Sequence, residues 1–109
     1  MRKIESPTGF DDSEVLDYVR EGQTITVRLK AWNDRVVKIT FNDAAGAEDL
    51  GLGDVSALIE EDGTTPFLEK LLLNLFETAP VLHPYRSFKF LNLDGASRLE
   101  IVAASVELR

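Results

Sequence analysis

The sequence lacks cysteine, contains one histidine, and has no long uninterrupted run of apolar residues. Without cysteine, a disulfide framework and thiolate metal sites are excluded. The most apolar stretch, Phe67 to Phe76, is interrupted by Glu69, Lys70 and Asn74, whereas a transmembrane helix needs about 20 apolar residues. The first residues also lack the apolar core of a secretory signal. We therefore expect a cytoplasmic protein that makes no contact with a membrane.

The charges that are present are mostly negative. The chain has 109 residues, of which 12 are basic and 19 acidic, and its formal net charge is −7. Hydrophobic residues make up 44% of it, enough for one core at this length, so we predict a single domain over residues 1–109. Nucleic-acid binders derive their affinity largely from lysine and arginine. We therefore predict no nucleic-acid partner for this acidic chain.

The first regular segment is Ser13 to Arg20, and two interpretations fit it. A short helix capped by Asp12 or Ser13 would bury its apolar side chains on one face. In a strand, the same side chains would alternate between two faces. The sequence favours the strand, because Glu21-Gly22 is typical of a tight turn into the strand that follows.

Two further segments alternate strictly between apolar and polar residues. Thr24 to Trp32 has this two-residue period, and Val36 to Phe41 repeats it after the Asn33-Asp34 turn. Connections this short predict an antiparallel meander of three strands. Asn42 to Gly53 contains three glycines and several acids, which predicts an irregular loop. Another strand is expected over Val55 to Glu60.

One helix is expected in the second half of the chain. Thr65 is a suitable N-cap, and Pro66 fits the first helical position, where its missing N–H costs nothing. The helix is expected to end near Glu77 or Thr78, before Pro80. Apolar residues recur on one face at spacings of three and four: Phe67, Leu68, Leu71, Leu72, Leu75 and Phe76.

The last part of the chain predicts a hairpin. Arg86 to Leu91 forms the first strand, Asp94-Gly95 the turn, and Leu99 to Leu108 a long second strand. The second strand has apolar residues on both faces, which is typical of a central strand. The predicted fold class is α+β: a mostly antiparallel sheet of five or six strands, built from the β-meander and the C-terminal hairpin and packed against one main helix.

The order of these segments matches a known pattern. Asp11-Asp12-Ser13 precedes the first strand, and an amphipathic meander and a long final strand follow. In this the chain resembles small uncharacterised bacterial β-rich domains, among them the immunity protein 50 family of polymorphic-toxin systems. That family tends to open with a His-Asp-Ser-like tripeptide, and Asp11 stands here in place of the histidine. The resemblance implies a non-enzymatic domain that binds a partner protein, and it transfers no catalytic residue.

All of the net negative charge comes from one segment. Between Asp43 and Asp62 there are seven acids and no base, and elsewhere acids and bases balance 12 to 12. An acidic loop attracts a basic partner and speeds its encounter, although a loop that only keeps the protein soluble has the same composition. Trp32, at a strand end, is the best candidate for an exposed anchor. We therefore predict that a basic protein partner binds at Trp32, Asp43, Glu48, Asp49, Asp54, Glu60 and Glu61.

Two alternatives remain open. A small metal-dependent or acid–base enzyme would use Asp11, Asp12 and His83, because carboxylates and a histidine can transfer protons or bind a metal. A homodimer would form through an exposed sheet face or an edge strand. The sequence itself predicts no catalytic residue, metal or cofactor, because it has neither a Gly-x-Ser-x-Gly motif nor EF-hand spacing.

Overall fold

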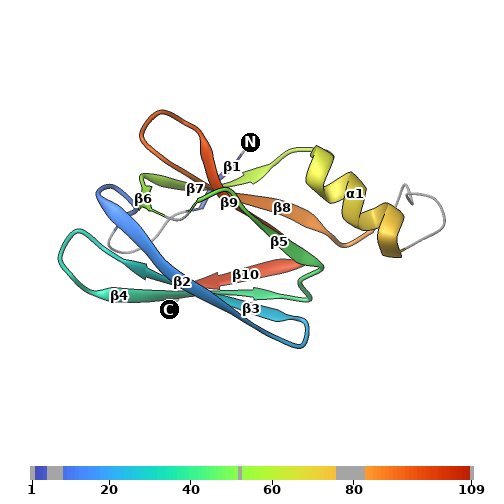
Figure 1. Ribbon diagram of the computed structural model, residues 1–109, viewed down its shortest axis with the longest axis horizontal. Coiled ribbons are helices and arrows are strands. Elements are labelled where there is room, and N and C mark those ends of the chain that lie inside the picture. The colour runs from blue at the N-terminus through green and yellow to red at the C-terminus, as the bar shows by residue number, and fades with distance from the viewer. Residues whose placement is uncertain (1, 5–8, 52, 76–82, 109) are drawn as a thin grey trace.

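The structure, a computed structural model, describes residues 2–4, 9–51, 53–75 and 83–108. In these residues two five-stranded antiparallel sheets face each other, and a helix lies outside one of them (Figure 1). The first sheet has the strand order β1-β7-β8-β9-β5, and the second has the order β10-β4-β3-β2-β6. The elements are β1 (Arg2–Lys3), β2 (Ser13–Glu21), β3 (Thr24–Lys30), β4 (Val36–Asn42), β5 (Gly46–Asp49), β6 (Asp54–Val55), β7 (Ala57–Glu61), α1 (Pro66–Leu75), β8 (Arg86–Leu91), β9 (Ser97–Ala103) and β10 (Ser105–Leu108).

The predicted meander is present as β2, β3 and β4. These strands pair antiparallel, with Val27 opposite Ile39 and Leu29 opposite Val37. Cross-strand partners point to the same side of a sheet, so the alternating apolar residues form one continuous face. The strand interpretation of Ser13 to Arg20 is thereby confirmed, and the helix interpretation is wrong.

Three of the segments that pass from one sheet into the other are described along their whole length. β4 leads into β5, β6 leads into β7 at Ser56, and β9 leads into β10 at Ala104. The first and last of these crossings run side by side. The N–H of Ala104 donates to the carbonyl of Asn42 (3.0 Å), and the N–H of Ala45 donates to the carbonyl of Val102 (2.7 Å). These shared segments hold the two sheets face to face.

This arrangement corrects three expectations. The expected single sheet is two sheets, because the chain bends at the crossings and folds the meander over the hairpin. Asn42 to Gly53 is not an irregular loop throughout, since it contains β5, which pairs with β9. The strands expected over Val55 to Glu60 and over Leu99 to Leu108 are each divided by a bend between the sheets.

The main core lies between the two sheets. Phe41 of β4 packs against Phe88 and Phe90 of β8, with ring centroids 5.4 and 6.1 Å apart. The two inner apolar faces bury each other, so this core does not depend on the helix. Fully buried aliphatic residues surround the three rings: Ile25, Val27, Leu29, Ile39, Leu58, Leu99 and Ile101.

The helix covers a smaller apolar patch on the outer face of the first sheet. Thr65 caps it as predicted, because its Oγ1 accepts a hydrogen bond from the N–H of Leu68 (3.1 Å). Leu68 and Leu72 pack against Val102 of β9. β9 is therefore covered on both faces, as its mixed apolar pattern predicts.

Only part of the predicted apolar face of the helix is buried against the sheet. Leu72 is buried and Leu71 is half-buried, but Leu75 is 54% exposed. The physical reason is that the second sheet already covers the inner face of the first, which leaves the helix only a small outer patch. The predicted helix end near Glu77 or Thr78 lies outside the described residues.

Candidate functional site

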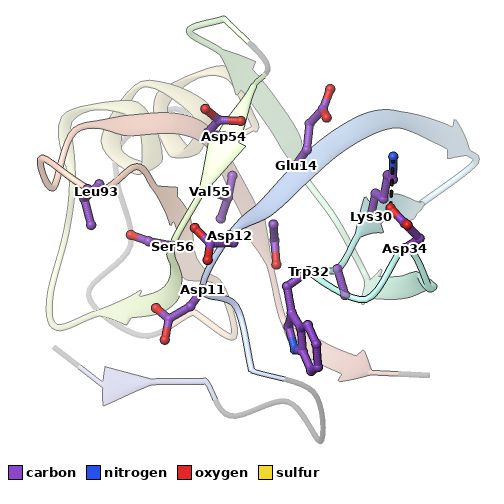
Figure 2. Close-up of a pocket in the computed structure, with 12 residues that line it drawn as sticks. Asp11, Asp12, Glu14, Lys30, Trp32, Asp34, Asp54, Val55, Ser56 and Leu93 are labelled. Carbon is purple, nitrogen blue, oxygen red and sulfur yellow. Dashed lines mark ion pairs between the residues drawn. The ribbon is translucent and has the colours of Figure 1, made fainter.

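An open cleft of about 630 Å³ (Figure 2) lies near β6, at the end of the sandwich opposite α1 (Figure 1). Its walls come from the N-terminal end of β2, the turn between β3 and β4, β6, and the turn between β8 and β9. A volume in this range is typical of ligand sites in proteins. Five of the residues that line it are acidic: Asp11, Asp12, Glu14, Asp34 and Asp54.

The turn between β3 and β4 places Trp32 at the cleft. The N–H of Asp34 donates to the carbonyl of Ala31 (2.9 Å), and the N–H of Ala31 donates to the carbonyl of Arg35 (2.8 Å). Asp34 has a φ of 64°, and Asp12 on the β2 side has a φ of 55°. Aspartate tolerates this left-handed conformation better than most residues. The turn predicted at this position is confirmed, and its conformation suits the aspartate that occupies it.

Negative charge dominates the cleft. Lys30 is the one basic residue of the described lining, and its Nζ lies 3.3 Å from Oδ1 of Asp34 (Figure 2). Within the part of the chain that the structure describes, the other four carboxylates of the lining form no ion pair. Carboxylates that line one cleft give it a negative electrostatic potential, which attracts a cationic group.

The lining of the cleft also includes two exposed apolar side chains and a hydroxyl group without a hydrogen-bond partner among the described residues. Trp32 is 63% exposed and Leu93, in the turn between β8 and β9, is 90% exposed. Ser13 also lines the cleft but is only 1% exposed, and its Oγ has no hydrogen-bond partner among the described residues. The cleft therefore combines negative charge, an indole ring, an aliphatic side chain and a buried polar atom.

The structure brings two of the predicted partner-binding residues, Trp32 and Asp54, into this cleft. It places Asp43 after the far end of β4, away from the turn that carries Trp32. The prediction of one continuous acidic loop is wrong, because β5, β6 and β7 divide the segment. The other four predicted residues lie on strands of the first sheet: Glu48 and Asp49 on β5, and Glu60 and Glu61 on β7.

Two of the acids on β7 already have basic partners within the first sheet. Glu60 accepts a hydrogen bond from Nη2 of Arg2 at 2.6 Å. Glu61 forms an ion pair with Lys89 at 3.7 Å. Their charges are therefore partly neutralised within the protein, and they are weaker candidates for a partner surface than the carboxylates of the cleft.

The enzyme alternative needs Asp11, Asp12 and His83 in one place. The two aspartates line the cleft, but His83 does not. Its Nδ1 accepts a hydrogen bond from the N–H of Tyr85 (3.2 Å), and Tyr85 packs against the patch beneath α1. His83 therefore lies next to the patch beneath α1, and α1 and β6 lie at opposite ends of the sandwich (Figure 1). Within the described residues, no three His, Cys, Asp or Glu side chains are arranged to hold a metal ion.

Sequence reasoning missed several residues of the cleft. Ser13, Lys30, Asp34 and Leu93 belong to three segments that are distant in the sequence and meet only in the tertiary structure. One local signal was available for Asp34, because the predicted turn places it two residues after Trp32. The position of Leu93 in the cleft could not be predicted, because the sequence around it does not indicate which other strand ends lie near its turn.

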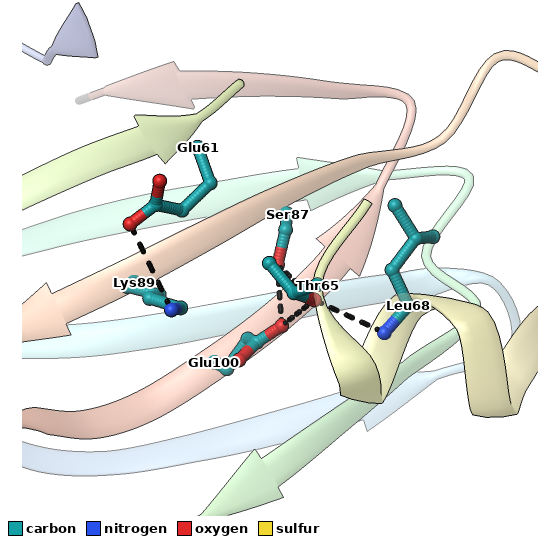
Figure 3. A network of polar contacts seen from close by, with 6 residues as sticks. All are labelled: Glu61, Thr65, Leu68, Ser87, Lys89 and Glu100. Carbon is teal, nitrogen blue, oxygen red and sulfur yellow. Dashed lines mark hydrogen bonds and ion pairs between the residues drawn. The ribbon is translucent and has the colours of Figure 1, made fainter. Parts of the chain in front are cut away.

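A second polar centre lies beneath the start of α1 (Figure 3). Glu100 of β9 is 5% exposed, and its Oε2 accepts hydrogen bonds from Oγ1 of Thr65 (2.6 Å) and from Oγ of Ser87. Thr65 simultaneously accepts the N–H of Leu68, so its hydroxyl group both caps the helix and binds the carboxylate. This network ties the start of the helix to β8 and β9, and none of its residues lines the cleft.

Comparison with protein-family profiles, with curated proteins and with solved structures found no match to this chain. Among the residues that the structure describes, no helix has the length and apolar character needed to cross a membrane. The functional argument therefore depends on the geometry and charge of the cleft.

Proposed function

We propose that this protein is a non-enzymatic protein-binding module whose acidic cleft binds a basic segment of a partner protein. The observation that supports this most is that one cleft is lined by four exposed carboxylates that form no ion pair within the described residues, and by the exposed ring of Trp32. Complementary charge speeds association and selects the partner, and tryptophan is enriched among the residues that dominate binding energy. In the immunity-type role that the sequence resembles, the partner would be a basic toxin.

The proposal moves the expected binding surface from the Asp43–Asp62 segment to the cleft. It keeps Trp32 and Asp54 from the predicted set. It adds three acids that lie just before and at the start of β2 and line the same cleft: Asp11, Asp12 and Glu14.

The test compares two variants with the same net charge. The cleft variant carries Asp11→Asn, Asp12→Asn and Asp54→Asn, and the control variant carries Glu21→Gln, Asp43→Asn and Glu69→Gln at exposed positions outside the cleft. Partners are first isolated on the immobilised parent protein from the native cell, and association rates are then measured with purified partner at several salt concentrations. We expect the cleft variant to associate more slowly and with a weaker salt dependence, while the control variant resembles the parent.

Equal loss in both variants would show that only the overall charge matters, and an unchanged rate in the cleft variant would show that the partner binds elsewhere. Either result contradicts the proposal. The predicted homodimer stays a separate prediction, and light scattering at several protein concentrations tests it.

A further inference from the structure

We propose that the outer face of the second sheet binds a second copy of this chain in a dimer with two-fold symmetry. This inference goes beyond the proposed function and does not depend on it. Two observations support it. The charged side chains of this face are separated into an acidic half and a basic half, and exposed apolar side chains lie among them.

The register of the strands shows which side chains form this face. Val27 and Leu29 of β3 belong to the core between the sheets, so Arg28 and Lys30, which alternate with them, point outward. Cross-strand partners lie on the same face of a sheet, so the partners of these two residues on β2 and β4 also point outward. The helix α1 lies outside the first sheet and leaves this face of the second sheet open to solvent (Figure 1).

The sign of the charge on this face changes once, between β2 and β3. The strands β6, β2, β3 and β4 are neighbours in this order. The outward charged residues of the first two strands are all acidic: Asp54, Glu14, Asp17 and Glu21. Those of the other two strands are all basic: Arg28, Lys30 and Lys38.

Many of these charges are available for contacts with another molecule. Arg28 binds Asp17, and Lys30 forms an ion pair with Asp34. Lys38 and the other three acids form no ion pair with any residue that the structure describes. Exposed ion pairs are also weak and exchange partners easily. The face can therefore form a second set of ion pairs without losing a buried one.

A two-fold axis that runs along the strands, between β2 and β3, makes this pattern self-complementary. Rotation about the axis places β2 of one copy over β3 of the other and β6 over β4, and it keeps each residue at the same level along the strands. Because Glu14 and Lys30 are cross-strand partners, Glu14 of each copy then lies over Lys30 of the other. Each contact of such an interface occurs twice, and sheets with aligned strands commonly pack face to face. An axis over β3 would instead place Arg28 against Arg28, so the charges select one arrangement.

The apolar side chains of this face support the same arrangement. Val19 of β2 and Val36 of β4 are 52% and 51% exposed. Val19 is the cross-strand partner of Thr26, so the rotation places it over Thr26 of the second copy, which carries a methyl group. Burial of apolar surface supplies an attraction that salt does not screen.

The net charge of the face favours a second copy as the occupant. Its four acids and three bases nearly balance, although the chain as a whole has a net charge of −7. Two copies therefore meet here with much less repulsion than their total charge would produce. The face is small, because β6 contributes only two residues, and small interfaces give weak complexes. We therefore expect a dissociation constant on the order of 100 μM.

The first experiment measures self-association of the full chain by analytical ultracentrifugation, at protein concentrations from about 10 μM to about 1 mM. We expect a reversible equilibrium between monomer and dimer that shifts toward the monomer at high salt, because exposed ion pairs are screened. A chain that stays monomeric over this range at low salt overturns the inference.

Two charge reversals then test the position of the axis. Lys30→Glu would make acids face each other at both symmetry-related contacts, and Glu14→Lys would make bases do so. We expect each variant alone to dimerise at least about tenfold more weakly than the parent. An equal mixture of the two should form a heterodimer at least as tightly as the parent dimerises, because each of these contacts again joins opposite charges. Both variants keep a net negative charge, so general attraction between them does not produce this result.

The control pair carries Glu69→Lys and Lys70→Glu, at exposed positions of α1 outside this face. These substitutions change the net charge by the same amounts as the test pair. We expect each control variant, and their mixture, to self-associate as the parent does. A loss in the control variants as large as in the test variants would show that only the total charge matters, and it overturns the inference.

The remaining outcomes are also decisive. Dimerisation of both test variants at the parental strength would show that the copies meet through another surface, such as an edge strand, and it overturns the inference. Loss in each test variant without recovery in the mixture would show that Glu14 does not face Lys30, and it overturns the proposed arrangement. Recovery in the mixture cannot come from misfolded chains, so it supports the inference even if the single variants are less stable.

These results are separate from the test of the proposed function. Glu14 and Asp54 also line the cleft, so a basic partner and a second copy would compete for them. A failure to self-associate leaves the binding of a basic partner unaffected. A cleft that binds no basic partner leaves the dimer unaffected.

Discussion

The carboxylates at the two ends of this molecule differ in burial and in hydrogen bonding. At the helix end, Glu100 is buried and its Oε2 accepts two hydrogen bonds from hydroxyl groups. At the other end, four carboxylates of the cleft are exposed and form no ion pair within the described residues. A buried charge is tolerated only when its hydrogen bonds are made inside the protein, whereas an exposed charge remains available to a partner. The helix end therefore has a structural role, whereas the exposed carboxylates of the cleft fit the binding role that we propose for it.

The same contrast holds for hydroxyl groups. Thr65 uses its Oγ1 as donor to Glu100 and as acceptor for the helix N-terminus. Ser13 is also buried, but its Oγ has no hydrogen-bond partner in the described part of the chain. Substitutions at the two ends should therefore affect different properties, namely stability at the helix end and binding at the cleft.

The largest expected difference comes from neutralising one glutamate at each end. Glu100→Gln removes the charge that strengthens two hydrogen bonds, and we expect the free energy of unfolding to fall by about 3 kcal/mol. Glu14→Gln in the cleft should change it by no more than about 0.5 kcal/mol, because this side chain is exposed. Urea denaturation of both variants measures the difference. Equal effects would remove the distinction between the two ends.

A smaller effect is expected from the hydroxyl groups. Thr65→Val removes the N-cap and one hydrogen bond to Glu100, and should lower the free energy of unfolding by about 2 kcal/mol. Ser13→Ala removes an atom without a partner, so stability should be unchanged or slightly higher. Thermal unfolding of the two variants tests this. A clear loss of stability in Ser13→Ala would show that its hydroxyl group has a structural partner after all.

The smallest effect concerns a carboxylate that is exposed but paired. Arg28 of β3 binds both carboxylate oxygens of Asp17 on β2, and its hydrogen bonds hold the pKa of Asp17 below the ordinary value of 3.8. A lowered pKa in the folded state means that the pair stabilises the protein above pH 3.8, and that this contribution is lost as the pH falls through the lowered pKa.

Asp17→Asn provides the test of this third case. The variant should be slightly less stable than the parent near neutral pH, and the two should converge in strong acid, where the aspartate is protonated. High salt should reduce the difference, since both side chains are exposed. Denaturant titrations at several pH values measure it. A difference that is constant with pH would mean that the charge of Asp17 contributes nothing.

Much of the fold could be predicted because its signals are local. Alternation along the chain predicted β2, β3, β4, β8 and β9, and the pair Thr65-Pro66 predicted the start of the helix. The crossing between the sheets at Ala104 also coincides with a change in the alternation of inward-facing residues. The residues that face the core between the sheets are the odd-numbered Leu99, Ile101 and Ala103 in β9, and then the even-numbered Val106 and Leu108 in β10. A phase shift of this kind marks a bend, because an unbroken strand keeps its alternation.

The sequence by itself determined the strands, the turns and the helix cap, because each depends on the conformational preferences of neighbouring residues. Only the tertiary structure decided that the strands form two sheets, that Glu100 is buried under a helix cap, and that acids from β2 and β6 share a cleft with Trp32. The physical reason is that burial and electrostatic interaction depend on distance in space. Residues far apart in the chain acquire that distance only when the core between the sheets forms.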